Sequence, residues 1–129
     1  MFTIDQIKAA HSRVKSGADF PSYIREIKGL GVTHYEAYVT DGHIDYHGVQ
    51  NYSAKVPAKY DALIVAETPN SEQFKTELFA HQQGKTDFLT FIKMCATYGI
   101  EKWEISMDKM TCTYYDKKGN EILVEKIPQ

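Results

Sequence analysis

The chain has 129 residues, of which 43% are hydrophobic, 25% charged and 12% aromatic, a composition typical of one globular domain. The 15 Lys and Arg residues against 17 Asp and Glu residues give a net charge of −2, which disfavours nucleic acid as a partner. The longest apolar run, residues 62–66, is far shorter than the ~20 residues of a membrane span, so no membrane partner is expected. The N-terminal residues are typical of a first helical turn and not of a targeting segment, which predicts a cytoplasmic protein.

Each half of the chain is predicted to begin with two helices. The first helices start at Thr3 and Asn70, because each of these residues is followed three positions later by Gln, the spacing of a capping box. The second helices start at Asp19 and Asp87. Each second helix is followed by a glycine at the position expected for a C-cap, Gly31 in the first half and Gly99 in the second.

A β-hairpin follows the second helix of the first half. Asp41-Gly42 is a strong signal for a two-residue hairpin turn. A turn at this place pairs Val39 with Ile44 and Glu36 with His47. Because side chains alternate along a strand, one face of this hairpin is apolar and the other is polar.

The second half is predicted to contain an equivalent hairpin. Its turn lies at Asp108-Lys109 and pairs Ile105 with Cys112. A third strand is expected to complete each half, at residues 62–66 in the first half and 122–127 in the second. These elements follow one another in the same order in both halves.

The two halves are also similar in sequence at an offset of 68 residues, where Phe20 falls on Phe88 and the two C-cap glycines fall on each other. The halves span about residues 3–66 and 70–127. The predicted fold class is α+β, a single domain of residues 1–129 with two similar α-α-β-β-β halves and helices packed on one face of antiparallel sheet. The pattern leaves open whether the halves share one sheet.

Four aromatic residues are predicted to lie on the apolar face of the sheet: Tyr35, Tyr46, Trp103 and Tyr114. One interpretation places them in the core, with the tyrosine hydroxyls at its rim. The other interpretation is that they line a pocket for a planar ligand between the helices and the sheet. The sequence is compatible with both.

The polar face of the first hairpin carries three histidines and two carboxylates: His34, His43, His47, Glu36 and Asp45. Residues of these types are candidate metal ligands. Because residues four apart on a strand lie about 13 Å apart, His43 and His47 cannot both bind one ion. The feasible ligands are therefore His34, Glu36 and His47. The alternatives are a solvated face with a Glu36–His47 pair, or a polar interface with a partner.

Three segments carry a family resemblance: HQQGKTDFLTF, GIEKW and TCTYYDKKGN. They resemble a bacterial family of about this length that is called YbcV-like or "phage envelope protein-like", a domain of unknown function with the number 1398. The resemblance covers essentially the whole chain, and the TCTYYD run before a Gly-Asn turn is its most specific part. It implies a small intracellular bacterial protein of unknown function and supplies no catalytic residues.

The sequence contains no assembled catalytic signature and predicts a non-enzymatic binding or regulatory module without a cofactor. Its partner would be a protein or a small molecule. The alternative is a small metal-binding protein or enzyme that uses the polar face of residues 34–47. Cys95 and Cys112 are expected as reduced core thiols. Since edge strands leave backbone groups unpaired, pairing through residues 122–124 into a homodimer is a further hypothesis.

Overall fold

The computed structural model describes residues 2–15 and 19–127. In the first half, the elements are α1 (Ile4–His11), α2 (Phe20–Gly29), β1 (Val32–Tyr38), β2 (Ile44–Gly48), a short 3-10 helix η2 (Val49–Asn51) and β3 (Ser53–Val56). In the second half, they are α3 (Ser71–Gln82), α4 (Phe88–Thr97), β4 (Lys102–Ser106), β5 (Thr111–Tyr115) and β6 (Glu121–Lys126). The α+β fold with two similar α-α-β-β-β halves is confirmed.

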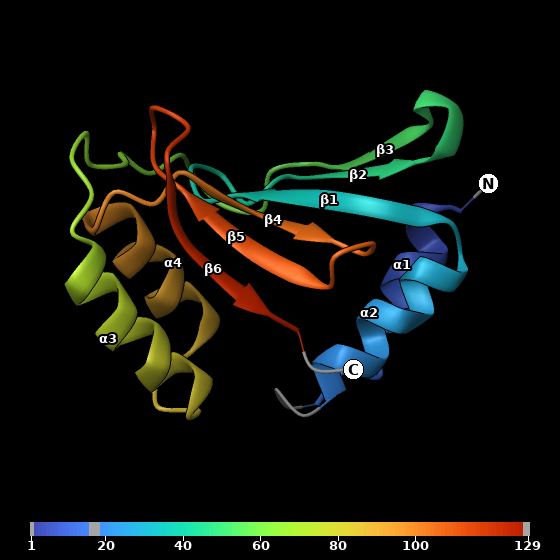
Figure 1. Cartoon of the computed structure of the whole chain (residues 1–129), viewed down its shortest axis with the longest axis horizontal. Coiled ribbons are helices and arrows are strands. Elements are labelled where there is room, and N and C mark those ends of the chain that lie inside the picture. The colour runs from blue at the N-terminus through green and yellow to red at the C-terminus, as the bar shows by residue number, and fades with distance from the viewer. Residues whose placement is uncertain (1, 16–18, 128–129) are drawn as a thin grey trace.

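All six strands form one antiparallel sheet in the order β3-β2-β1-β4-β5-β6. The pairing of β1 with β4 joins the two halves, which answers the question that the sequence pattern leaves open. Figure 1 shows both helix pairs on the same side of the sheet, α1 and α2 toward one end and α3 and α4 toward the other. Within residues 2–15 and 19–127, no α-helix lies on the opposite face of the sheet.

The helix starts follow the predicted capping residues with one exception. Thr3 and Gln6 form the complete capping box, in which each backbone N–H donates to the other side chain. Asn70 and Asp87 each accept the backbone N–H three residues further along. Asp19 does not cap α2, because its carboxylate accepts the N–H of Lys15 in the preceding loop.

The register of the first hairpin differs from the predicted one by two residues. Glu36 lies opposite Asp45, and His34 lies opposite His47. A shift of two residues keeps every side chain on its predicted face, since the side-chain period of a strand is two. The prediction that Glu36 pairs directly with His47 is therefore wrong, although both residues remain on the polar face.

The backbone of Val39 explains the shift. Its N–H donates to the carbonyl of Glu101 at 2.9 Å, and its carbonyl accepts the hydroxyl of Tyr60 at 2.6 Å. Val39 is completely buried and belongs to the junction between the halves. The predicted ladder with Ile44 therefore does not form, and the loop between β1 and β2 is longer than the two residues that Asp41-Gly42 predicts.

The second hairpin has the predicted register. Ile105 lies opposite Cys112, and residues 107–110 form the turn. The third strand of this half is confirmed as β6, which starts one residue earlier than predicted. Both Cys95 and Cys112 are buried free thiols.

The prediction of a strand at residues 62–66 is wrong. The third strand of the first half is β3, an edge strand that ends immediately before Pro57, as the missing N–H of proline requires. Residues 62–66 instead bridge two other elements, because Leu63 donates to the carbonyl of Thr40 and Ala66 donates to the carbonyl of Ala96.

The core lies between the sheet and the helices. Its largest fully buried side chains come from both halves, among them Phe2, Ile24, Ile27, Phe74, Ile92 and Ile100. Each helix pair covers only part of the apolar sheet face, so space remains between the pairs. Among the helices of the described residues, none combines the length and apolar character that crossing a membrane requires.

Candidate functional site

A cavity of about 450 Å³ lies between α1, α2, α4 and the apolar face of the sheet. Small-molecule pockets usually have volumes of about 300–1,000 Å³. Seven Phe, Tyr and Trp side chains contribute to the wall: Phe20, Tyr23, Tyr35, Tyr38, Tyr46, Phe88 and Trp103. Because these residues come from both halves, the shared sheet is what assembles the cavity.

Ala37 creates a depression in the sheet at this point. It lies on β1 between Ile44 of β2 and Trp103 of β4, and all three residues line the cavity. The side chain of Ala37 is a single methyl group between two much larger neighbours. The row of side chains is therefore recessed at the cavity, where Ala37 is buried.

The structure brings together three of the four aromatic residues predicted to bind a ligand. Tyr35, Tyr46 and Trp103 line the cavity, and the ring centroids of Tyr35 and Tyr46 are 5.0 Å apart. Tyr114 lies elsewhere, with its ring packed edge-on against Phe74 at 5.1 Å. It borders a wider groove of about 1190 Å³ between the two helix pairs, which Trp103 also lines.

The ionisable groups of the cavity are basic or phenolic. Lys8 and His11 come from α1, and Lys59 comes from the loop after β3. Among the described residues, no carboxylate lines the cavity. Partial burial lowers the pKa of Lys59, and the nearby charge of Lys8 lowers it further. Burial raises the pKa of Tyr35 well above its usual value, so its phenol keeps its proton at neutral pH.

Lys8 and Lys59 are not among the residues that the sequence singles out. A signal for Lys8 exists, because it follows the buried Ile7 at the border of the apolar stripe of α1, where a long cationic side chain covers apolar surface. No comparable signal exists for Lys59. It lies in an irregular segment after Pro57, and only the three-dimensional path of the chain brings it to the cavity.

The second candidate site is the polar face of the first hairpin. The rings of His34 and His47 stack with centroids 4.4 Å apart and planes 9° apart. One oxygen of Glu36 lies 3.3 Å from Nε2 of His47, and the other accepts a hydrogen bond from Nζ of Lys102 at 2.6 Å. The three predicted metal ligands are therefore neighbours, but the carboxylate of Glu36 already forms an ion pair with the ammonium group of Lys102.

His43 lies beside two other carboxylates. Its Nδ1 lies 2.5 Å from Oδ1 of Asp41, and its Nε2 lies 4.0 Å from Oδ2 of Asp45. Burial alone would raise the pKa of Glu36, but Lys102 and His47 outweigh it and hold that pKa below its usual value. In the part of the chain that the structure covers, no group of three or more His, Cys, Asp or Glu residues is arranged to hold a metal ion.

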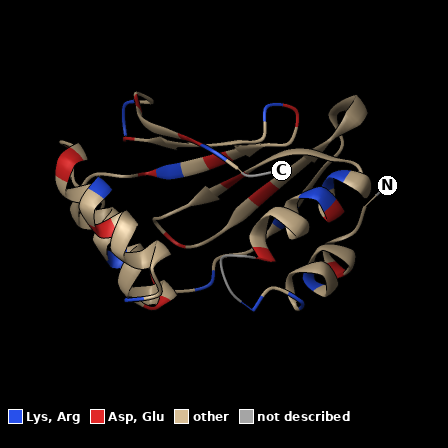
Figure 2. Cartoon of the chain, turned by 60° about the horizontal axis from the view of Figure 1, so that its bottom comes forward, with Lys and Arg blue, Asp and Glu red and all other residues tan. Residues whose placement is uncertain are grey.

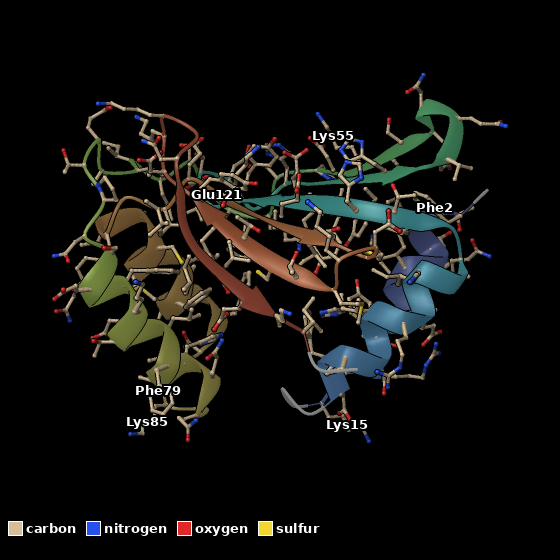
Figure 3. All side chains as sticks on the ribbon, in the orientation of Figure 1. Phe2, Lys15, Lys55, Phe79, Lys85 and Glu121 are labelled. Atoms are coloured by element: carbon tan, nitrogen blue, oxygen red, sulfur yellow. The ribbon has the colours of Figure 1, made fainter. Side chains whose placement is uncertain are left out.

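Charges of both signs are mixed over the helices and strands, as Figure 2 shows. Figure 3 places Lys15 and Lys85 at the ends of the two helix pairs that are farthest from the sheet. It also shows Lys55 on the uncovered face of the sheet, where its ammonium lies 3.7 Å from Asp45. The absence of carboxylates from the cavity wall therefore contrasts with the mixed surface.

No curated protein matches the chain. The family model described as "Protein of unknown function (DUF1398)" matches residues 8–126. That range contains the polar face of the first hairpin and every cavity residue except Ile7. Because the match spans nearly the whole sequence, the chain belongs to this family of proteins of unknown function.

Proposed function

We propose that this protein is a non-enzymatic binding module that holds a small molecule with a planar apolar body in the cavity of about 450 Å³. The observation that carries the proposal is the aromatic wall around the depression at Ala37. Rings that line a cavity offer a large apolar surface to a flat ligand and favour stacked or edge-on contacts. Burial of that surface supplies the free energy of binding.

Tyr35 adds a polar contact for the ligand. It lines the cavity, and its hydroxyl makes no hydrogen bond to any of the described residues. This hydroxyl keeps some contact with solvent, so it can donate to an acceptor group of a ligand in the cavity. A protonated phenol at this position therefore supports the binding of a ligand that has an acceptor group.

The neighbouring hydroxyl and imidazole groups do not support an enzymatic role. Ser12 and His11 both line the cavity, but the hydroxyl of Ser12 donates to the backbone carbonyl of Ala9 at 2.6 Å. A serine nucleophile requires a base that accepts its proton. The arrangement of Ser12 is that of a helix-end hydroxyl bonded to its own backbone, and this supports binding without turnover.

The proposal is tested with naphthalene-2-carboxamide, a flat neutral probe. Calorimetric titration is carried to millimolar probe, because about 0.3 kcal/mol per non-hydrogen atom corresponds to a Kd in that range for a molecule of this size. Trp103 is the only tryptophan, so its single indole N–H resonance reports binding beside it, and the Ala37→Leu variant distinguishes the cavity from the wider groove that Trp103 also lines. We expect that resonance to shift on titration.

Two matched variants, each with an alanine replaced by leucine, locate the binding site. Ala37→Leu fills the depression and should weaken binding at least about tenfold. Ala9→Leu makes the same change at an exposed position of α1 and should leave binding unchanged. Absence of binding, or equal binding by the parent and Ala37→Leu with both variants folded, would contradict the proposed function.

A further inference from the structure

We propose that the cavity is selective for an organic anion, a flat apolar molecule whose acidic group lies between Lys8 and Lys59. This inference rests on the proposed function and adds the charge of the ligand to it. Both lysines line the cavity, although one belongs to α1 and the other to the loop after β3. Two cationic groups from separate elements therefore meet at the same apolar space.

The fold fixes the backbone of Lys59 beside the cavity. Its N–H donates to the carbonyl of Asp41 at 2.8 Å. Gly42 packs against it so closely that a Cβ at Gly42 would lie 3.2 Å from Cβ of Lys59 and 2.6 Å from the ring of Tyr60. The turn between β1 and β2 thus holds the Lys59 segment in place, and α1 supplies Lys8.

The two ammonium groups have no carboxylate partner in the described part of the chain. Most lysines of the described chain have no acidic side chain within 4.0 Å, and what distinguishes Lys8 and Lys59 among them is that both line the cavity. The protein as a whole has a net charge of −2, so carboxylates are plentiful elsewhere. An unneutralised pair of cations beside an apolar wall has the charge complementary to an organic acid.

The electrostatics of the cavity support the same ligand class. Burial and the charge of Lys8 lower the pKa of Lys59, which means that the folded protein disfavours two cations at this place. A bound anion would reverse that penalty, because it lies close to both ammonium groups. The hydroxyl of Tyr35 would donate to the same or another acceptor of the ligand.

The test compares naphthalene-2-carboxylate with naphthalene-2-carboxamide, two probes of the same shape that differ in charge. We expect the parent protein to bind the carboxylate about tenfold more tightly than the carboxamide. Lys8→Met and Lys59→Met should each reduce this preference severalfold, and the double variant should abolish it. Both lysines are exposed residues, so circular dichroism should show that the variants remain folded.

Lys93→Met is the matched control, because it removes one positive charge from an exposed position of α4 that does not line the cavity. It should keep the full preference. Equal affinity for the two probes, with both lost in Ala37→Leu, would overturn the anion inference and leave the proposed function standing. A carboxylate preference that survives the double variant would overturn the assignment to Lys8 and Lys59. If neither probe binds, both proposals are wrong.

Discussion

Glu36 and Lys102 form an ion pair across the junction between the two halves of the protein, with Nζ of Lys102 2.6 Å from Oε2 of Glu36. The two residues lie on β1 and β4, the central strands of the sheet. Their side chains are 17% and 27% exposed, so water screens the pair less than it screens a surface ion pair. Glu36 also has Asp45 and Glu104 as cross-strand neighbours. The positive charge of Lys102 therefore offsets the repulsion among these carboxylates.

Removal of Lys102 should therefore destabilise the protein. Lys102→Met leaves Glu36 partly buried among carboxylates, and we expect the free energy of unfolding at pH 7 to fall by about 1–3 kcal/mol. Lys55→Met is the control, because Lys55 is 67% exposed and 3.7 Å from Asp45; its loss should cost less than about 1 kcal/mol. Urea unfolding of the two variants measures the difference. Equal effects would show that the junction pair contributes no more than a surface pair.

The same ion pair predicts that the stability of the protein depends on pH. The pKa of Glu36 is lowered, so its contribution to stability is present above its ordinary pKa of 4.5 and is lost as the pH falls through its folded value. The pKa of Lys102 is raised, so its contribution is present below 10.5 and is lost as the pH rises through its folded value. The stability gap between the parent and Lys102→Met should be largest between these limits. A gap that is unchanged at pH 3 would contradict this assignment.

Sequence periodicity predicts the faces of the strands better than their partners. Alternation places Tyr35, Tyr46 and Trp103 on the apolar face, and a register shift of two residues leaves that result unchanged. The shift itself is not readable, because it arises from hydrogen bonds of Val39 to Glu101 and Tyr60, which are far away in sequence. Tertiary hydrogen bonds at the junction, and not the local turn signal, therefore determine the register of the first hairpin.

The third strand of the first half shows a second limit. Residues 62–66 are the most apolar run of the chain, yet Ile64 is 94% exposed and the segment pairs with no strand. Strand β3 is weakly apolar because it is a short edge strand. The place of Lys59 in the cavity is likewise not predictable from the sequence, since this residue reaches the cavity only through the path of an irregular segment. The family resemblance is confirmed for the family of unknown function, and the YbcV-like name stays a prediction.

Gly99 is predicted to be less tolerant of substitution than Gly119. Both residues have positive φ, 81° and 84°. A Cβ at Gly99 would lie 2.7 Å from Cα of Pro69, whereas a Cβ at Gly119 would meet nothing within 4 Å. We expect Gly119→Ala to cost about 1–2 kcal/mol from backbone strain alone. Gly99→Ala should cost at least about 1 kcal/mol more, because the backbone of residues 68 and 69 must move.

Thermal unfolding of the two glycine variants gives this comparison directly. If both variants lose the same stability, the close approach of Pro69 to Gly99 does not restrict the position.

The metal prediction for the first hairpin can be tested through Lys102. Its ammonium competes with any cation for Glu36, so Lys102→Met should raise the affinity for Zn²⁺ at least about tenfold if His34, Glu36 and His47 are ligands. Adding His47→Ala to that variant should remove the gain, whereas adding His11→Ala, a histidine outside the hairpin, should not. Calorimetric titration with Zn²⁺ measures each affinity. An affinity that does not respond to Lys102→Met would rule out this ligand set.

The edge strand β6 carries the homodimer hypothesis. It pairs only with β5 in the described chain, and Val124 on it is 50% exposed. An unpaired strand edge with an apolar side chain can pair with the same edge of a second copy. We expect a dimeric mass at micromolar concentration by native mass spectrometry, and Val124→Lys should shift the population to monomer because two lysines would then meet across the contact. Val49→Lys changes a valine that is 60% exposed and lies away from β6, so it should keep the parent mass. A monomeric parent protein would exclude pairing through β6.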